Sequence, residues 1–262
     1  MIQSSGVKGA FRDLAETLWP NAPEDVAALF GREAKRTPGH ETATQPGALS
    51  FTDARLLALP VRSSVAPFVW VGCPSLVARL ARDLALIGWN GVASTVEAPG
   101  DKALGFTETT GTIVLEDLAL PVGRLSLSPS SLQDATIDTI MRQAAGSLWS
   151  TIKERWFLVS DEHFQFLAEN ATEVQPRIAL GPNKTTDDGG NLWYQEVLPS
   201  ETLLYTMVFA AAERKANGQG LDDAAVLQKA ESLKTAGYIQ MGGDETLGRG
   251  IFEMAWVNGT GS

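Results

Sequence analysis

The order of the apolar segments is the feature that most constrains the fold of this chain. Short strand-like and helix-like runs follow one another from end to end, separated by turns rich in Gly, Pro and polar residues. Residues 66–73 (APFVWVGC) are typical of a buried strand, and residues 74–89 begin with Pro and continue with helical periodicity. Strands are joined by hairpins as often as by helices. The pattern therefore predicts an α+β fold with helices on one face of its sheets, including ferredoxin-like units.

The first helix is predicted at residues 4–19. Ser5 is its expected N-cap, and Val7, Phe11, Leu14 and Leu18 lie on its apolar face. Further helices are expected at 20–31, 128–152, 161–171 and 221–237, and single strands at 110–120 and 201–211.

Two segments differ from this alternation. Residues 172–199 read as two strands joined by the turn GPNKTTDDGGN, which predicts a long hairpin. Residues 32–49 are polar and rich in Gly, Pro and Thr, so we expect a mobile loop there. Neither segment has the composition of a linker, and we expect one domain over residues 1–262.

Composition limits the setting and the partners. The net charge of −10 disfavours binding to free nucleic acid, although residues 1–62 contain seven basic and seven acidic residues and are neutral overall. Cys73 is the only cysteine, which excludes an internal disulfide and a Cys-rich zinc site. No signal peptide and no apolar run long enough to span a membrane is evident. We therefore expect a cytoplasmic protein without a membrane partner.

Common catalytic motifs are absent. The segment GFTETTG (105–111) lacks the lysine of a phosphate-binding P-loop, and no G-x-S-x-G motif is present. His163 stands beside two carboxylates at an expected helix start, and His40 lies in the polar loop, so we interpret both as structural or incidental.

The segment GGDETLGRG (242–250) combines four glycines, two carboxylates and Arg249 between two expected strands. Glycine lets the main chain approach a ligand closely, successive amides can bind an anion, and Arg249 can pair with a phosphate through two hydrogen bonds. We interpret this segment as a phosphate-binding loop. Asp244 and Glu245 suit ordering of the loop better than metal binding. The helix start SSGVKG (4–9) is a second, weaker phosphate candidate.

Several segments together resemble the RAMP superfamily of CRISPR systems, and more narrowly the repeated backbone subunit of the type III-B Cmr effector complex. The similar segments run in the order of the family and cover most of the chain. They are SSGVKGAFRD (4–13), GALSFTDARLLALPVRS (47–63), FVWVGCP (68–74), LVSDEHFQFLAENATEVQPRIAL (158–180), LWYQEVLPSETLLY (192–205) and IQMGGDETLGRG (239–250).

The resemblance implies a ferredoxin-like (RRM-like) RAMP core with helical insertions and a β-hairpin thumb, best matched by residues 172–199. It implies an RNA-guided antiviral ribonucleoprotein whose subunits polymerise along the guide. The implied partners are a CRISPR guide RNA, complementary target RNA, copies of the chain and other Cmr subunits. The protein would hold the RNA backbone while base pairing reads the sequence, and the thumb would displace bases of the duplex at regular intervals.

The resemblance also implies a set of guide-binding residues. At the first helix they are Ser5, Lys8 and Gly9, and the chain has Gly6 where the family often has a second serine. Arg62 and Ser63 match the PVRS turn. The glycine-rich loop contributes Gly242, Gly243, Thr246, Gly248, Arg249 and Gly250. For Arg55 we favour an ion pair between strands or subunits.

Catalysis is left open by the sequence. The family's metal-dependent cleavage of target RNA uses an aspartate on a loop before the first helix, a position that would precede Met1 here, so we expect no assignable catalytic residue. Asp13, Asp53 and Asp244 are the only candidate substitutes. The main alternative function is a metal-dependent endoribonuclease that uses Mg²⁺ or another divalent ion. A small-molecule enzyme built on the glycine-rich loop is a further alternative.

Overall fold

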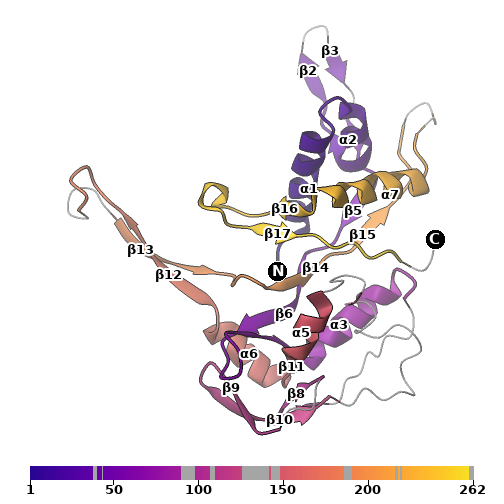
Figure 1. Ribbon diagram of the computed structural model, residues 1–262. Coiled ribbons are helices and arrows are strands. Elements are labelled where there is room, and N and C mark those ends of the chain that lie inside the picture. Colours follow the sequence, from indigo (N-terminus) through magenta and orange to yellow (C-terminus); the bar gives the residue numbers. More distant parts are fainter. Residues whose placement is uncertain are drawn as a thin grey trace. The chain divides into compact units, whose positions relative to one another are not determined.

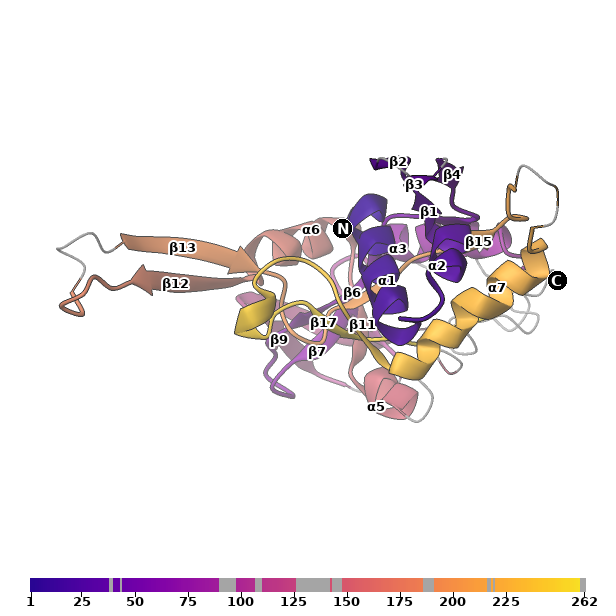
Figure 2. The same ribbon diagram turned by 90° about the horizontal axis from the view of Figure 1, so that it is seen from above.

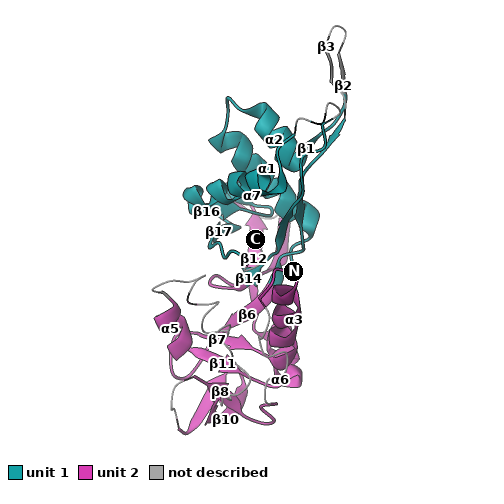
Figure 3. Cartoon of the chain, turned by 90° about the vertical axis from the view of Figure 1, so that its right-hand side faces the viewer, with its two compact units in different colours: residues 1–55, 204–258 teal, residues 56–203, 259–262 magenta. Residues whose placement is uncertain are grey.

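The computed structural model describes residues 1–37, 40–42, 44–89, 98–106, 110–125, 142, 148–185, 191–215, 218 and 220–259. The chain forms two compact units, shown in different colours in Figure 3. Unit 1 contains Met1–Arg55 and Leu204–Asn258, and unit 2 contains Leu56–Leu203 and Gly259–Ser262. Among the described residues, no helix is long and apolar enough to cross a membrane. The expectation of a single domain over the whole chain stays a prediction.

Unit 1 combines helices with short antiparallel strand pairs (Figure 1). Its helices are α1 (Ser4–Leu18), α2 (Pro23–Phe30) and α7 (Asp223–Ser232), and α7 continues into the 3₁₀ helix η2 (Leu233–Ala236). The strand pairs are β1 (Gly31–Arg32) with β4 (Gln45–Pro46), β2 (Lys35–Thr37) with β3 (His40–Thr42), β5 (Leu49–Phe51) with β15 (Val208–Ala210), and β16 (Tyr238–Gln240) with β17 (Ile251–Glu253).

The core of unit 1 forms around α1. Val7, Phe11 and Ala15 recur at intervals of four residues and are buried. Burial of Val7 and Phe11 agrees with the predicted apolar face over the first turns of the helix. The Phe11 ring lies 5.2 Å from the Phe51 ring of β5. At the other end of α1, Leu18 is exposed, so the predicted face does not extend over the whole helix.

A mixed sheet of order β14-β6-β7-β11-β8-β10-β9 has most of its residues in unit 2, while Arg55 of β6 and Leu204 and Tyr205 of β14 belong to unit 1. The strands are β6 (Arg55–Val61), β7 (Val69–Gly72), β8 (Ala103–Gly105), β9 (Thr112–Leu115), β10 (Leu118–Arg124), β11 (Trp156–Leu158) and β14 (Leu203–Tyr205), and the helices are α3 (Pro74–Ala85), α5 (Leu148–Glu154) and α6 (Asp161–Asn170). β7 pairs with β11, and β8 with β10, in parallel, while the pairs β6–β7, β8–β11 and β9–β10 are antiparallel. The predicted α+β class is confirmed.

The predicted long hairpin is present in unit 2. β12 (Glu173–Ala179) pairs with β13 (Asn191–Val197) in antiparallel register from Glu173–Val197 to Ala179–Asn191. Figures 1 and 2 both show this ribbon leaving the end of α6 and extending away from the helices and sheet of unit 2. Part of the turn that joins its strands, residues 186–190, lies outside the described residues.

Some local predictions were wrong. The expected loop at 32–49 contains the short strands β2, β3 and β4. The single strand expected at 110–120 is a hairpin, because Glu116 has a φ of 50° and turns the chain between β9 and β10. The strand expected at 201–211 is interrupted at Thr206 and Met207 and is only partly buried. Most of the helix expected at 128–152 lies outside the described residues.

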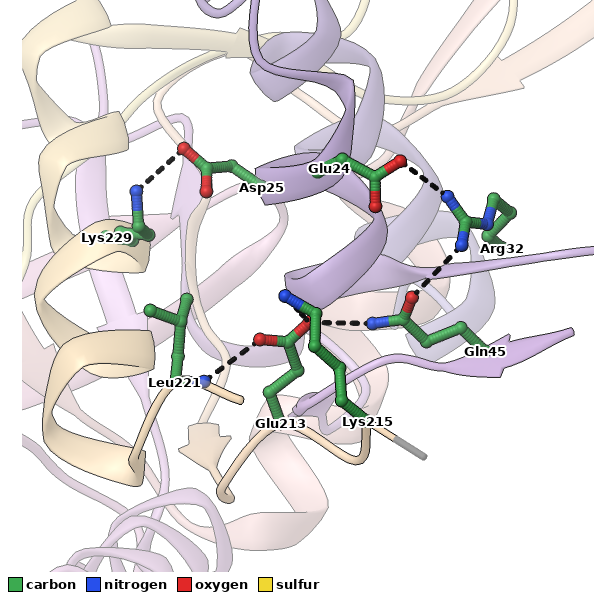
Figure 4. A network of polar contacts seen from close by, with 8 residues as sticks. All are labelled: Glu24, Asp25, Arg32, Gln45, Glu213, Lys215, Leu221 and Lys229. Carbon is green, nitrogen blue, oxygen red and sulfur yellow. Dashed lines mark hydrogen bonds and ion pairs between the residues drawn. The ribbon is translucent and has the colours of Figure 1, made fainter. Parts of the chain in front are cut away.

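A buried carboxylate ties the segment before α7 to the first strands of unit 1 (Figure 4). The Glu213 side chain is fully buried and accepts hydrogen bonds from Gln45 Nε2 at 2.9 Å and from Leu221 N at 3.0 Å, and Lys215 Nζ lies 3.2 Å away. Burial by itself raises the pKa of Glu213, but the bonds from Leu221, Lys215 and Gln45 outweigh it and the pKa is lowered. The ionised form is therefore the one that stabilises unit 1.

We predict that Glu213→Gln destabilises the protein by about 2–4 kcal/mol, because it removes the charge opposite Lys215 and mismatches one buried donor. A folded pKa below the unfolded value means that this stability is present above about pH 4.3 and is lost as the pH falls through the folded pKa. Urea unfolding at pH 7 and at pH 3.5 measures both effects. Glu231→Gln, at an exposed pair with Lys234, is the charge-matched control and should change stability much less than Glu213→Gln. Equal unfolding free energies for the two variants at pH 7 would contradict the prediction.

Candidate nucleic-acid interface

The glycine-rich segment forms the exposed loop between β16 and β17. Met241 N donates to Gly250 O at 2.8 Å and closes the loop, and the 3₁₀ helix η3 (Glu245–Leu247) forms one turn inside it. Gly242, Gly248 and Gly250 have φ of 98°, 73° and 70°. A Cβ at Gly250 would lie 2.0 Å from Met241 O, so this position accepts only glycine. The loop thus presents backbone that a ligand can approach closely.

Arg249 is held inside the same loop. Its Nη1 lies 3.1 Å from Asp244 Oδ2, and its backbone N donates to Asp244 O at 3.4 Å. Asp244 adopts the left-handed conformation with φ 58° and precedes η3. Thr246 lies in η3 and is exposed, as are Gly242, Gly243 and Gly248. The expectation that Asp244 orders the loop agrees with these contacts.

The start of α1 differs from the prediction. Ser5 is not the N-cap: Gln3 occupies that position without a capping side-chain bond, and Ser4 N instead donates to Asp53 Oδ1 at 2.7 Å. A carboxylate therefore already satisfies the first amide of the helix, which is where an anion was expected. Ser5 and Gly9 remain exposed, one turn apart on the same face of α1.

Lys8 follows Ser5 on α1 and is half-buried. Its Nζ donates to Leu49 O of β5 at 3.0 Å. Burial lowers the pKa of Lys8, and repulsion from Arg12 lowers it further. The structure brings α1 against β16, so Lys8 and the glycine-rich loop belong to neighbouring elements of unit 1.

Arg62 and Ser63 belong to unit 2, where they follow β6. Arg62 donates from Nε to Glu116 Oε1 at 3.0 Å and from Nη2 to Glu116 Oε2 at 2.7 Å. The hydrogen bonds and the charge of Glu116 raise the pKa of Arg62. Ser63 forms a β-bridge with Leu115, and its Oγ accepts from Val65 N at 3.2 Å. Arg62 and Ser63 thus lie in unit 2, whereas α1, β16 and the glycine-rich loop belong to unit 1.

The β12–β13 hairpin has two chemically different faces. Directly paired residues share a face, and one side contains Val174, Pro176, Ile178, Leu192 and Tyr194. We call it the apolar thumb face, and it also contains Glu196, which lies opposite Val174. Tyr194 is 70% exposed and Ile178 58%. The opposite side includes Gln175, Arg177, Trp193 and Gln195. A row of exposed apolar side chains of this kind marks a contact surface.

The remaining candidates give no catalytic centre. Asp13 is exposed, Asp53 caps α1 and Asp244 pairs with Arg249. Within the described residues, no three His, Cys, Asp or Glu side chains gather in a way that could hold a metal ion. The main-chain N–H of His163 donates to Ser160 Oγ at the start of α6, and the structural role expected for the His163 side chain stays a prediction. The His40 side chain lies outside what the structure describes.

Sequence reasoning missed Glu116 and misjudged Asp53. A signal for Glu116 was present, since residues 112–120 (TIVLEDLAL) contain two apolar runs around the acidic pair ED. Nothing in the sequence indicated that Asp53 would meet the first amide of α1, because the two residues are 49 positions apart.

Comparisons with known proteins agree with this architecture. The family model described as RAMP superfamily matches residues 1–253. The CRISPR system Cmr endoribonuclease Cmr4 of Pyrococcus furiosus is 27% identical over 256 residues, covering 97% of this chain and 82% of the relative. The CRISPR system CMR subunit Cmr4 of Saccharolobus solfataricus is 23% identical over 277 residues, covering 98% and 85%.

Solved structures show the same fold. The crystal structure of oligomeric Cmr4 from Pyrococcus furiosus has a TM-score of 0.70 at 23% identity and covers 97% of this chain and 84% of that one. A chain of the type III-B Cmr-beta cryo-EM structure in the apo state has a TM-score of 0.71 at 19% identity and covers 98% and 84%. Because the family model matches nearly the whole sequence, this chain belongs to the RAMP superfamily.

Proposed function

We propose that this chain is the CRISPR RNA-binding backbone subunit of a type III-B effector complex. It assembles with copies of itself along a guide RNA, joins other Cmr subunits and positions complementary target RNA. The observation that carries the proposal is the near-complete match to two Cmr4 relatives, which covers 97% and 98% of this chain. One similar solved structure is of Cmr-beta bound to cognate target RNA, with a TM-score of 0.66. A cytoplasmic location completes the proposal.

The guide contact is assigned to the cluster formed by the start of α1 and the glycine-rich loop. The exposed amides of the loop approach a phosphate without side chains between them, and Arg249 and Lys8 supply positive charge. Only this local region needs to favour RNA, so a net charge of −10 on the whole chain is compatible with binding in a groove lined by several subunits.

The hairpin is assigned to assembly. The apolar thumb face packs against the next copy of the chain, because a row of five apolar residues gains more from burial against protein than from exposure beside phosphates. The polar face, with Arg177 and Trp193, remains for the guide–target duplex. Support for self-association comes from the relative crystallised in oligomeric form.

Target cleavage is a separate question. One relative is named an endoribonuclease, yet the described residues of this chain offer no acidic cluster to which the step can be assigned. We therefore assign no catalytic residue. Incubation of the assembled complex with complementary RNA and Mg²⁺ distinguishes the two functions: bound, intact target supports a positioning subunit alone, and cuts at regular intervals establish the enzyme.

We predict that Lys8→Ala combined with Arg249→Ala weakens guide retention. Loss of two cations should flatten the dependence of log K on log salt by up to about 1.4, because each single-strand phosphate contact contributes about 0.7. Filter binding of guide to the assembled complex from 50 to 500 mM salt measures the slope. Lys234→Ala, at an exposed pair on η2, controls for charge alone. Retention in the double variant equal to that of the control would refute the site.

We predict that Ile178→Ser combined with Tyr194→Ser reduces self-assembly. Losing the burial of two large side chains costs about 3 kcal/mol or more, equivalent to at least a roughly hundredfold weaker association. Sedimentation velocity measures the assembly, and the melting temperature should change little because both side chains are exposed in the single chain. The matched control is Gln175→Ser with Gln195→Ser, a directly opposed pair on the other face. Equal assembly of the two double variants would exclude the apolar face as the contact.

A further inference from the structure

Both arginines expected to hold guide phosphates already hold a carboxylate. Arg62 is paired with Glu116 in unit 2, and Arg249 is paired with Asp244 in unit 1. The two pairs come from unrelated parts of the chain and have the same chemistry. Carboxylate and phosphate oxygens both accept the paired N–H groups of a guanidinium, so each carboxylate occupies donors that a phosphate would use.

The Arg62–Glu116 pair is fixed by the backbone around it. Glu116 N donates to Arg62 O at 3.1 Å, and the neighbouring Ser64 N donates to Val114 O at 3.0 Å. The Glu116 side chain is 14% exposed, whereas Arg62 is 83% exposed. The acid thus lies beneath the arginine, and the guanidinium is the part that an RNA strand reaches first.

The Asp244–Arg249 pair is also fixed by backbone. Leu247 N donates to Asp244 O at 2.9 Å and Arg249 N to the same oxygen at 3.4 Å, so the turn holds both side chains on one side of the loop. Arg249 is 23% exposed and Asp244 36%.

Both acids occupy unusual backbone positions. Glu116 has φ 50° and Asp244 has φ 58°, in the left-handed region that glycine adopts most readily and that asparagine and aspartate tolerate better than glutamate. Glu116 is the first residue of the two-residue turn between β9 and β10, where glycine is common in hairpins with a positive φ at this position. Backbone shape alone does not call for an acid at either turn. Each acid does, however, place a carboxylate against an arginine.

We propose that Glu116 and Asp244 are specificity-determining residues that neutralise Arg62 and Arg249 in the subunit without RNA and yield these arginines to guide phosphates. The proposal rests on the proposed function, because it needs the two arginines to face the guide. The Arg62 side chain is 83% exposed, and an ion pair in contact with solvent contributes little stability, so a phosphate can replace the carboxylate at small cost. Unrelated RNA that binds one subunit gains little binding free energy from such an exchange. A guide that is bound by many subunits gains binding free energy at each of them.

The test is the affinity of the purified single chain for an unrelated 20-nucleotide oligouridine. Glu116→Gln and Asp244→Asn keep the shape and an acceptor oxygen but remove one negative charge. Each should steepen the slope of log K against log salt by about 0.7, which is about fivefold stronger binding for each tenfold reduction in salt. Glu231→Gln makes the same change of net charge at a pair with Lys234 and should leave the slope unchanged. Fluorescence anisotropy from 20 to 200 mM salt measures the affinity of each variant for the oligouridine and so gives this slope.

The outcomes separate the two proposals. Tighter oligouridine binding by Glu116→Gln and Asp244→Asn, but not by Glu231→Gln, supports the inference. The same holds if Glu116→Gln and Asp244→Asn are the only variants that bind measurably. Unchanged or weaker binding in both overturns it, because the acids would then only position the arginines or serve the turns. Arg62→Gln and Arg249→Gln in the assembled complex test the proposed guide contacts directly. If the arginine variants retain the guide less well but the acid variants bind oligouridine as the unmodified chain does, the proposed guide contacts are supported and the inference is refuted.

Discussion

Burial of one face of α1 is the interaction on which unit 1 depends. Val7 and Ala15 have no exposed surface, and Phe11 is almost completely covered. The helix packs against α2, β5, β16 and η2, which come from both ends of the sequence. Removal of Phe11 would leave a cavity costing about 3–5 kcal/mol, a large share of the stability of a domain. The same packing sets Lys8 against Leu49 and brings α1 into contact with β16, the strand that leads into the glycine-rich loop.

Internal neutralisation is shared by the cations that the proposed function places at the guide. The chain carries ten more acidic than basic residues, and the cations expected at the guide each meet an internal oxygen acceptor. Lys8 meets a backbone carbonyl, while Arg62 and Arg249 meet carboxylates. The amide at the start of α1 meets Asp53 in the same way. In the proposed function, affinity for phosphate would depend on how readily these oxygens are exchanged, rather than on the number of cations alone.

The sequence predicted most elements that depend on local pattern. The helix at α1, the hairpin β12–β13 and the loop between β16 and β17 are each encoded by contiguous residues with a clear period or turn signal. Predictions failed where a single residue interrupts a pattern. Glu116 adopts a positive φ inside an otherwise strand-like run, and the cap of α1 comes from Asp53, which only tertiary structure brings near. The partners of Arg62 and Arg249 could not be predicted either. Each pair depends on the geometry of a turn, and amino-acid composition does not reveal that geometry.

The glycines of the loop between β16 and β17 divide by physical role. Gly250 is required by the fold, since any side chain there would strike Met241 O, 2.0 Å from the position of its Cβ. Gly243 is different: its φ lies outside the range that disfavours side chains, and no atom lies within 4 Å of a Cβ placed on it. The folded chain therefore tolerates a side chain at Gly243, and a Cβ there would project into open space. In the proposed function that space belongs to the guide backbone, so the absence of a side chain at Gly243 is explained by the ligand, whereas Gly250 is explained by the loop itself.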